Sequence, residues 1–76
     1  MQKDLTFDAT GMLCPMPILK TAQKIKEIGV GKILEILADD EGAREDFPAW
    51  CEQTGNEFLG IEEEGKTLKF YIRRKT

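Results

Sequence analysis

The chain contains no histidine, and this absence removes several kinds of active site at once. Without imidazole there is no Ser–His–Asp triad, no Cys–His nucleophile pair and no histidine-bound metal. The two cysteines, Cys14 and Cys51, are too few for a tetrahedral structural zinc site unless carboxylates or a second chain contribute ligands. We therefore expect no metal and no cofactor, and any covalent chemistry must be carried by cysteine.

Glycine-rich phosphate loops and long apolar runs are also missing. Gly29 and Gly31 flank a single valine before an expected strand, whereas a phosphate loop precedes a helix. No run is long enough to span a bilayer, and the opening "MQKDLTFDATG" contains an acid and no continuous apolar stretch. We expect a cytoplasmic protein without membrane contact, in which thiols stay reduced and a structural disulfide is disfavoured.

The composition that remains is that of one small globular domain, residues 1–76. Apolar residues make up 41% of the chain and charged residues 33%, unlike a disordered sequence. The net charge of −3 argues against direct nucleic-acid binding, which usually requires a basic surface. The tail Arg73–Lys75 is a local basic exception, interpreted either as a solvated strand end or as a docking site for an acidic partner.

The first half of the chain predicts a strand, a helix and a second strand. A short strand around 5–7 runs into a loop at 8–11, and an amphipathic helix follows the prolines. Gly29 is typical of the residue that ends a helix with a positive φ. The run "KILEILA" then predicts a central strand, whose second face also carries apolar residues and so has room for a partner. The apolar residues of the helix are Ile18, Leu19, Ala22, Ile25 and Ile28, and those on the second face of the strand are Ile33 and Leu37.

The second half predicts another helix and a hairpin. Pro48 is tolerable only in a first helical turn, so the second helix should start close to Asp46, a good N-cap candidate. Gly55 should end it, and "EEGK" should join the last two strands in a tight turn. In the final strand Leu68, Phe70 and Ile72 should pack while Lys69, Tyr71 and Arg73 face water.

These elements define an α+β fold. Their order is β-α-β-α-β-β, which predicts a two-layer α/β sandwich with a four-stranded mixed sheet and both helices on one face. The chain shows no internal repeat, linker or low-complexity segment.

The stretch "CPMP" at residues 14–17 is the main candidate for chemistry. Pro15 suits the first position of a helix, and it pushes Cys14 toward extended geometry just outside that helix. The partial positive charge of a helix N-terminus would favour a Cys14 thiolate. Pro17 disfavours helical geometry at Met16, so the helix could start at Pro15 or at Pro17, and we favour Pro15.

Each cysteine also has an alternative interpretation. A cysteine before an amphipathic helix is often a small buried apolar residue, but helix initiation does not need the second proline, which favours a functional Cys14. Cys51 shares a helical face with Phe47 beside Trp50, which favours a packing role. The minority alternative for Cys51 is a resolving cysteine that pairs with Cys14.

The chain resembles the TusA (SirA-like) sulfur-carrier family. The segments "DATGMLCPMPILK", "ADD" and "DFPAWCEQTG" carry this resemblance, which extends from Leu5 to about Arg73. The central signature Asp-x-x-Gly-x-x-Cys-Pro-x-Pro is matched at Asp8, Gly11, Cys14, Pro15 and Pro17.

The resemblance implies a small cytoplasmic sulfur carrier. Cys14 would carry sulfane sulfur as a persulfide, Pro15 and Pro17 would shape its presentation, and Asp8 and Gly11 would shape the preceding loop. Asp40 matches a recurrent acidic position after the second strand. The implied donor is a cysteine desulfurase or a rhodanese-like protein. The implied acceptor is a sulfur-relay protein in tRNA thiolation, molybdenum-cofactor supply or sulfur oxidation.

Two departures weaken the tRNA-thiolation role in particular. Members with that role often carry a histidine after the second helix, where this chain has Asn56, and an acidic residue between the prolines, where it has Met16. Three other functions stay open from the sequence: a non-catalytic regulatory module of sulfur metabolism, an RNA-binding role by fold analogy, and a redox switch through both cysteines.

Overall fold

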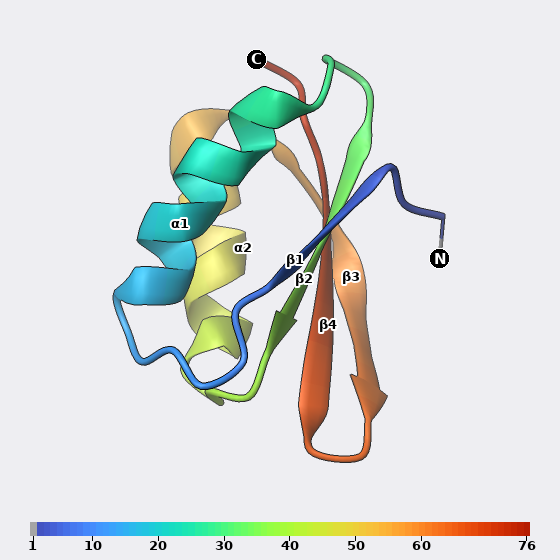
Figure 1. The fold of residues 1–76 in the computed structure, drawn as a ribbon. Helices are drawn as coiled ribbons and strands as arrows, with labels where there is room; N and C mark the ends of the chain where they lie inside the picture. The colour runs from blue at the N-terminus through green and yellow to red at the C-terminus, as the bar shows by residue number, and fades with distance from the viewer. Residues whose placement is uncertain (1) are drawn as a thin grey trace.

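The computed structural model describes residues 2–76 and contains four strands, two α-helices and one 3₁₀ turn (Figure 1). Their order confirms the expected β-α-β-α-β-β arrangement. The elements are β1 (Leu5–Asp8), α1 (Met16–Lys24), η1 (Ile25–Glu27), β2 (Ile33–Ala38), α2 (Ala43–Thr54), β3 (Glu57–Glu64) and β4 (Thr67–Arg73).

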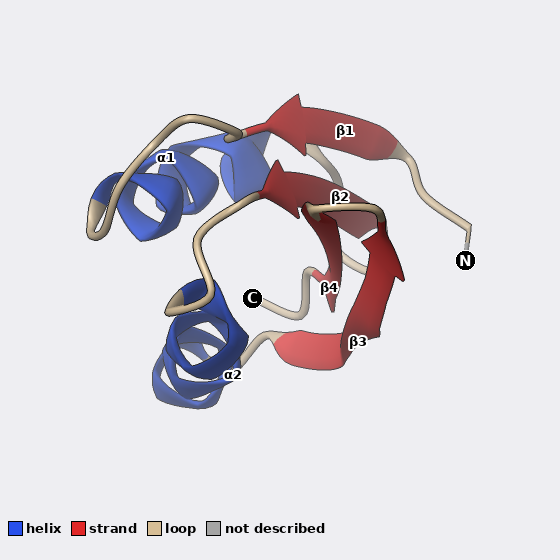
Figure 2. Cartoon of the chain, turned by 90° about the horizontal axis from the view of Figure 1, so that it is seen from below, coloured by secondary structure: helices blue, strands red, loops and turns tan. Residues whose placement is uncertain are grey.

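The strands form one mixed sheet in the order β1-β2-β4-β3. β1 pairs with β2 in parallel, and β4 pairs with β2 and β3 in antiparallel fashion. A parallel pair needs a long crossover, and α1 with η1 provides it. Both helices lie on the same side of the sheet (Figure 2), so the expected two-layer α/β sandwich is confirmed.

The core lies between the helix layer and the sheet. Phe47 of α2 packs on Phe70 of β4, with ring centroids 4.7 Å apart. Cys51 belongs to this core, which confirms the packing position expected for it. The other members of the core cluster are Ala9, Ile25, Ile28, Leu34, Ile36, Ala38, Ala43, Leu68 and Ile72.

The start of α1 differs from both sequence alternatives. The helix begins at Met16, and Pro15 is its N-cap with φ −97° and ψ 12°. The Pro15 carbonyl accepts the first helical hydrogen bond, from Leu19 N–H at 3.1 Å. Met16 N–H donates to the Leu13 carbonyl at 2.9 Å, so the chain already turns before the helix. Met16 thus adopts helical geometry despite the proline that follows it.

The start of α2 also differs from the prediction. The helix begins at Ala43, not near Asp46, and Pro48 lies inside it. Two interactions start it early: Gly42 N–H donates to the Asp40 carboxylate at 3.0 Å, and Ala43 N–H donates to the Asp40 carbonyl at 3.0 Å. Pro48 cannot donate the usual hydrogen bond, but the burial of Ala43 on the first turn favours the longer helix.

The buried face of α1 was only partly predicted. Ile25 and Ile28 are buried as expected, but Leu19 is 53% exposed, and Pro17 and Thr21 are buried instead. The helix tightens into the 3₁₀ turn η1 after Lys24. This change of helical period alters the facing of side chains only after Lys24, where Ile25 and Ile28 still face the core.

The second face of the sheet holds a buried polar network. Glu35 of β2 is 3% exposed and Tyr71 of β4 is 2% exposed, so the prediction that Tyr71 faces water was wrong. The Glu35 carboxylate accepts hydrogen bonds from Lys3 Nζ at 2.8 Å, Thr6 Oγ1 at 2.9 Å and Tyr71 OH at 2.6 Å. These side chains cover Glu35 without a second helix layer. Ile33 and Leu37 on this face are half-buried.

Candidate functional site

Cys14 lies exposed in the loop between β1 and α1, immediately before the N-cap Pro15. The Cys14–Pro15 peptide bond is cis. Pro17 occupies the second position of α1, where its missing N–H removes no helical hydrogen bond, and its ring is buried. The two prolines therefore lie on either side of the helix start, and the sulfur remains accessible outside it.

The loop before Cys14 is fixed by two carboxylates. The Asp8 carboxylate accepts hydrogen bonds from Thr10 N–H at 2.9 Å and Thr10 Oγ1 at 2.6 Å, and both lower the pKa of Asp8. Gly11 adopts a φ of +81°, which favours glycine, and its N–H donates to the two Asp39 oxygens at 3.1 and 3.2 Å. Asp8, the last residue of β1, and Gly11 thus both take part in hydrogen bonds of this loop, while Asp39 is a further partner that the sequence did not predict.

A carboxylate from α2 lies next to the thiol. Asp46 Oδ2 is 3.6 Å from Cys14 Sγ, with the thiol as the donor. Figure 1 shows why residues so far apart in sequence meet: the loop before α1 and the start of α2 lie side by side at the lower end of the molecule. Asp46 was expected only as an N-cap, because no local sequence pattern indicates a contact between the two helix starts.

The expectation of a Cys14 thiolate was wrong. Desolvation by nearby groups, the hydrogen bond to Asp46 and the negative charges of Asp46 and Asp40 all raise the pKa of the Cys14 thiol. Carboxylates disfavour a second negative charge beside them, so their effect on Cys14 opposes that of the partial positive charge at the start of α1. These surroundings therefore favour the protonated thiol over the thiolate.

Asp40 contributes a negative charge at the edge of the site. Its carboxylate is committed to Gly42 N–H at the start of α2, and its charge acts on Cys14 through space. The structure therefore brings Asp40 and Asp46 to the Cys14 end of the molecule, both on the chain around the start of α2. The surroundings of the thiol are acidic.

Exposed apolar side chains adjoin this acidic surface. Leu13 is 75% exposed, Met16 is 40% exposed and Leu19 is 53% exposed. Leu13 immediately precedes Cys14, and Met16 and Leu19 lie on the first turn of α1. We call these three residues the apolar rim. Side chains of this size exposed together often mark a contact surface.

The second cysteine lies in a different environment. Cys51 is buried on α2, and desolvation raises its pKa to about 11. A buried thiol with a high pKa is a poor nucleophile. Both cysteines are free thiols, so the geometry favours the packing role for Cys51.

The basic tail is occupied by internal contacts. Arg73 Nη1 pairs with Glu57 at 3.0 Å, and Lys75 Nζ lies 3.8 Å from the same carboxylate. Arg74 Nη1 donates to the Ile28 carbonyl at 2.6 Å. These contacts hold the end of the chain against β3 and against the residue that follows η1.

Residues 2–76 offer neither a metal-binding cluster nor a membrane-spanning helix. No group of three or more His, Cys, Asp or Glu side chains in this part of the chain is arranged to hold a metal ion. Within the same residues no helix has the length and apolar character needed to cross a membrane.

Together, fold and site define a small two-layer α/β domain with one exposed cysteine at a proline-flanked helix start. The family model described as Sulfurtransferase TusA matches residues 5–74. The chain belongs to this family, as the sequence resemblance predicted.

Curated relatives agree with this assignment. The chain is 42% identical over 74 residues to YrkI of Bacillus subtilis (strain 168), covering 97% of this chain and 99% of the relative. It is 43% identical over 74 residues to YrkF of the same organism; the match covers 97% of this chain but only 40% of YrkF. Both are named provisionally as sulfur carrier proteins. The sulfur carrier protein TusA of Allochromatium vinosum is 38% identical over 71 residues, 93% of each chain.

A solved structure supports the fold. The SirA-like protein of Desulfitobacterium hafniense superposes with a TM-score of 0.81 at 22% identity, covering 96% of this chain and all of the other. At that identity the likeness concerns the fold alone.

Proposed function

We propose that this protein is a sulfur carrier that accepts sulfane sulfur as a persulfide on Cys14 and passes it to an acceptor protein. The observation that carries the proposal is an exposed Cys14 thiol at a proline-flanked helix start in a chain that belongs to the Sulfurtransferase TusA family. Relatives named as sulfur carriers match nearly the whole chain. The proposal treats residues 1–76 as a single sulfur-carrier domain.

The proposed transfer is an exchange between sulfurs. The Cys14 sulfur attacks the outer sulfur of a donor persulfide; the donor's S–S bond breaks, and a new S–S bond forms at Cys14. The electron pair leaves with the donor sulfur, which takes up the proton lost from Cys14. An acceptor thiolate later attacks the outer sulfur on Cys14 and restores the Cys14 thiol. No external oxidant or reductant enters, because the sulfane sulfur keeps its oxidation state.

The carboxylates near Cys14 favour onward transfer of the sulfur over its storage on Cys14. Asp46 and Asp40 favour the protonated thiol at rest, so Cys14 must lose its proton when the donor arrives. A persulfide anion formed on Cys14 would be repelled by the same carboxylates. Repulsion of this kind favours onward transfer over storage, as a carrier requires.

The partners follow from the chemistry. The donor must present a protein persulfide, as a cysteine desulfurase or a rhodanese-like protein does, and the acceptor must present a thiolate to the same face. The apolar rim beside Cys14 offers both partners a contact surface. The pathway (tRNA thiolation, molybdenum-cofactor supply or sulfur oxidation) depends on the acceptor.

Loading by a donor tests the proposal. The protein is incubated with a cysteine desulfurase and cysteine, and its intact mass is measured under non-reducing conditions. We expect wild type and Cys51→Ser to gain the mass of a sulfur atom and Cys14→Ser to gain none. An unloaded wild type, or a Cys14→Ser variant loaded as fully as wild type, would overturn the proposal.

A further inference from the structure

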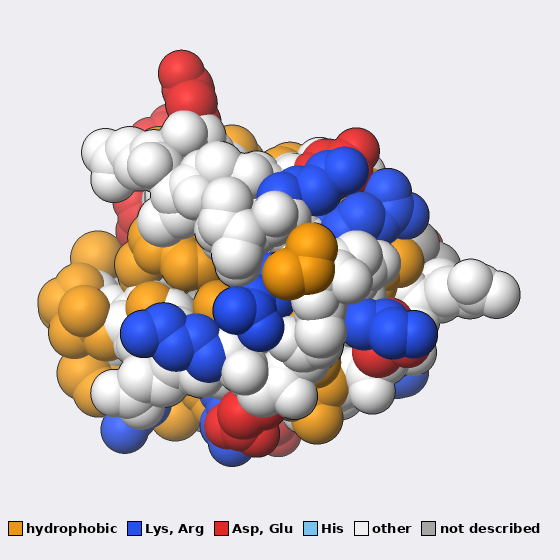
Figure 3. Space-filling model, turned by 90° about the horizontal axis from the view of Figure 1, so that it is seen from above, with side chains coloured by type: hydrophobic (Ala, Val, Ile, Leu, Met, Phe, Trp, Pro, Cys, Tyr) orange, Lys and Arg blue, Asp and Glu red, His pale blue; other side chains and the backbone are white. Residues whose placement is uncertain are grey.

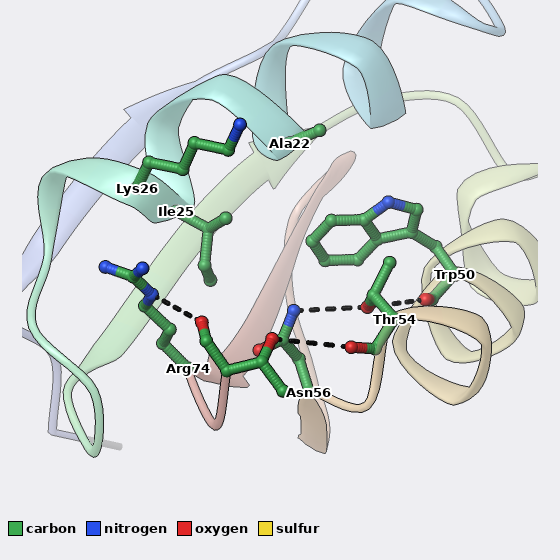
Figure 4. Close-up of a pocket in the computed structure, with 8 residues that line it drawn as sticks. Ala22, Ile25, Lys26, Trp50, Thr54, Asn56 and Arg74 are labelled. Atoms are coloured by element: carbon green, nitrogen blue, oxygen red, sulfur yellow. Dashed lines mark hydrogen bonds between the residues drawn. The ribbon is translucent and has the colours of Figure 1, made fainter.

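A cavity of about 210 Å³ lies where α1 and α2 end (Figure 4). In Figure 1 these helix ends lie at the end of the molecule opposite to the loop before α1, which carries Cys14. Its walls come from the last turns of α1 and α2, from η1 and from the chain after β4. Along α1, residues 16 and 25 are separated by roughly 14 Å at the usual helical rise. The lining residues are Ala22, Ile25, Lys26, Trp50, Thr54, Asn56, Arg74 and Thr76.

The inner part of the cavity is apolar and includes a flat wall. The Trp50 indole lies across from Ile25, with Ala22 on the α1 side (Figure 4). Ile25 is nearly fully buried, whereas Trp50 and Ala22 are half-buried and therefore reachable from solvent. An aromatic wall opposite aliphatic side chains accommodates a planar apolar group.

The mouth of the cavity is cationic. Lys26 is exposed and makes no ion pair among residues 2–76, so its ammonium is available to a ligand. Arg74 is held in place by hydrogen bonds from Nε to the Thr76 carbonyl at 2.8 Å and from Nη1 to the Ile28 carbonyl. Figure 3 shows several Lys and Arg side chains spread over this end of the molecule.

Helix geometry acts against an anion here, but its effect is reduced. α1 and α2 both end near the cavity, where carbonyl groups give partial negative charge. Arg74 Nη1 donates a hydrogen bond to the Ile28 carbonyl, and Thr54 Oγ1 donates one to the Trp50 carbonyl at 2.8 Å. Lys26 and Arg74 thus place positive charge beside carbonyl groups that are already partly satisfied.

We propose that this cavity binds a small organic anion with a planar apolar body and a single carboxylate. The body would lie between the Trp50 indole and Ile25, and the carboxylate would contact Lys26 and Arg74. The volume lies below the roughly 300 Å³ at which drug-sized pockets begin, so the ligand is small. The inference does not depend on sulfur transfer, because the cavity contains neither cysteine.

The test uses 3-phenylpropionate as the probe and its uncharged amide as the matched ligand. Trp50 is the only tryptophan, so its fluorescence reports directly on the cavity. Amide chemical shifts of the labelled protein locate the binding residues independently. We expect saturable binding of the carboxylate, with shifts confined to the cavity lining, and clearly weaker binding of the amide.

Three variants refine the test. Lys26→Gln should weaken binding of the carboxylate roughly two- to fivefold, the range for one exposed charge contact. Lys32→Gln changes the net charge equally but lies outside the lining, so it should bind like wild type. Ala22→Leu should block the cavity while keeping α1, because leucine is a good helix former.

Specific outcomes would overturn the proposal. These are no saturable binding of the carboxylate, equal binding of the amide, or equal weakening by Lys26→Gln and Lys32→Gln. Unchanged binding in an Ala22→Leu variant with a native circular dichroism spectrum would also contradict it. Cys14→Ser should bind the probe like wild type, so this result is separable from the test of sulfur loading.

Discussion

At the residue scale, the chemistry of Cys14 depends on a neighbour that is remote in sequence. The thiol and the Asp46 carboxylate belong to the starts of two different helices and lie 3.6 Å apart. The position of Cys14 next to a helix start could be predicted from the two prolines. Its raised pKa could not, because that required knowing how α1 and α2 pack.

Removing the neighbouring carboxylate should make the thiol more reactive. Asp46→Asn deletes the charge that raises the pKa of Cys14, so the pKa falls and the thiolate fraction rises at any pH below that pKa. We expect iodoacetamide to alkylate Cys14 several times faster at neutral pH, with the pH–rate curve displaced to lower pH.

The neighbouring acid provides the control for this experiment. Glu45→Gln removes the same charge one residue earlier in α2, where no hydrogen bond to Cys14 exists. Its alkylation rate should stay close to that of wild type. If Asp46→Asn reacts no faster than Glu45→Gln, the contact between Asp46 and Cys14 does not control the thiol.

The backbone conformation of the loop before Cys14 depends most directly on Gly11. Its φ of +81° is unfavourable for any residue with a Cβ, although a Cβ there would meet no atom within 4 Å. Gly11→Ala should therefore destabilise the fold through backbone strain alone, by about 1–2 kcal/mol. Chemical denaturation measures this loss.

Gly29→Ala is the matched change at a glycine without a positive φ, so the positive φ expected for Gly29 from the sequence was wrong. A Cβ at this position would make only an ordinary contact with Lys32 Cγ at 3.7 Å. This variant should stay within about 0.5 kcal/mol of wild type, the range for unremarkable surface changes. Equal losses in the two variants would show that the loop conformation is not strained by a side chain.

At the element scale, periodicity predicted which segments form helices and strands, and it failed at their edges. α2 starts three residues before Asp46 because Asp40 satisfies the backbone ahead of it. α1 starts between its two prolines because the Pro15 carbonyl already accepts a helical hydrogen bond. The spacing of apolar residues does not reveal such hydrogen bonds to side chains and carbonyl groups, so it cannot fix where a helix begins.

The sheet shows the same limit. Alternation placed Tyr71 on the solvent side of β4, and that side is correct, but Tyr71 is buried with Glu35. Burial came from the N-terminal segment and from neighbouring strands, whose positions no single strand pattern contains. The phenol beside the Glu35 carboxylate accordingly has a raised pKa, chiefly through desolvation.

The Glu35 network should make stability depend on pH. Burial alone would raise the pKa of Glu35, but hydrogen bonds from Lys3, Tyr71 and Thr6 and the charge of Lys3 lower it to about 2. A carboxyl group whose pKa is depressed in the folded state stabilises the fold above its unfolded value of about 4.5. That contribution, about 3 kcal/mol, is lost as the pH falls toward 2.

Glu35→Gln tests this linkage. At pH 7 the variant should lose roughly 2–4 kcal/mol of unfolding free energy, and the gap to wild type should narrow as the pH falls from about 4.5 toward 2. Glu52→Gln, on the exposed face of α2, should show no such gap. A difference that stays constant with pH would mean that Glu35 does not carry the depressed pKa.

At the scale of the whole molecule, two ends of one small sandwich carry different surfaces. The loop before α1 and the start of α2, at the lower end in Figure 1, carry Cys14, Asp46 and the apolar rim. The ends of α1 and α2, at the upper end, contribute to the cavity with Lys26 and Arg74. Strand order and layer arrangement could be predicted from the element order. The separation of acidic and basic surfaces could not be predicted from the sequence. It depends on which loops come together at the same end of the folded molecule.

The apolar rim should serve contact with the sulfur donor. Leu13 is 75% exposed, so Leu13→Ser should leave the fold and the alkylation rate of Cys14 almost unchanged. We expect it to slow loading by a desulfurase roughly three- to tenfold at limiting concentrations, the cost of losing one interface side chain. Loading kinetics followed by intact mass provide the measurement.

Val30→Ser is the control for this surface. Val30 is also largely exposed, but it follows η1 at the opposite end from Cys14. It should load at the wild-type rate. If both variants slow loading equally, the rim has no special part in docking the donor.

The central claim is that Cys14 carries sulfur between two proteins, and tracing a heavy sulfur isotope tests it most directly. The protein is loaded by a desulfurase supplied with isotope-labelled cysteine, isolated, and mixed with an acceptor thiol. We predict that peptide mass spectrometry finds the label on the Cys14 peptide before mixing and on the acceptor afterwards, with the Cys14 thiol restored. Label on Cys51, or label that stays on Cys14 when the acceptor is added, would contradict the account.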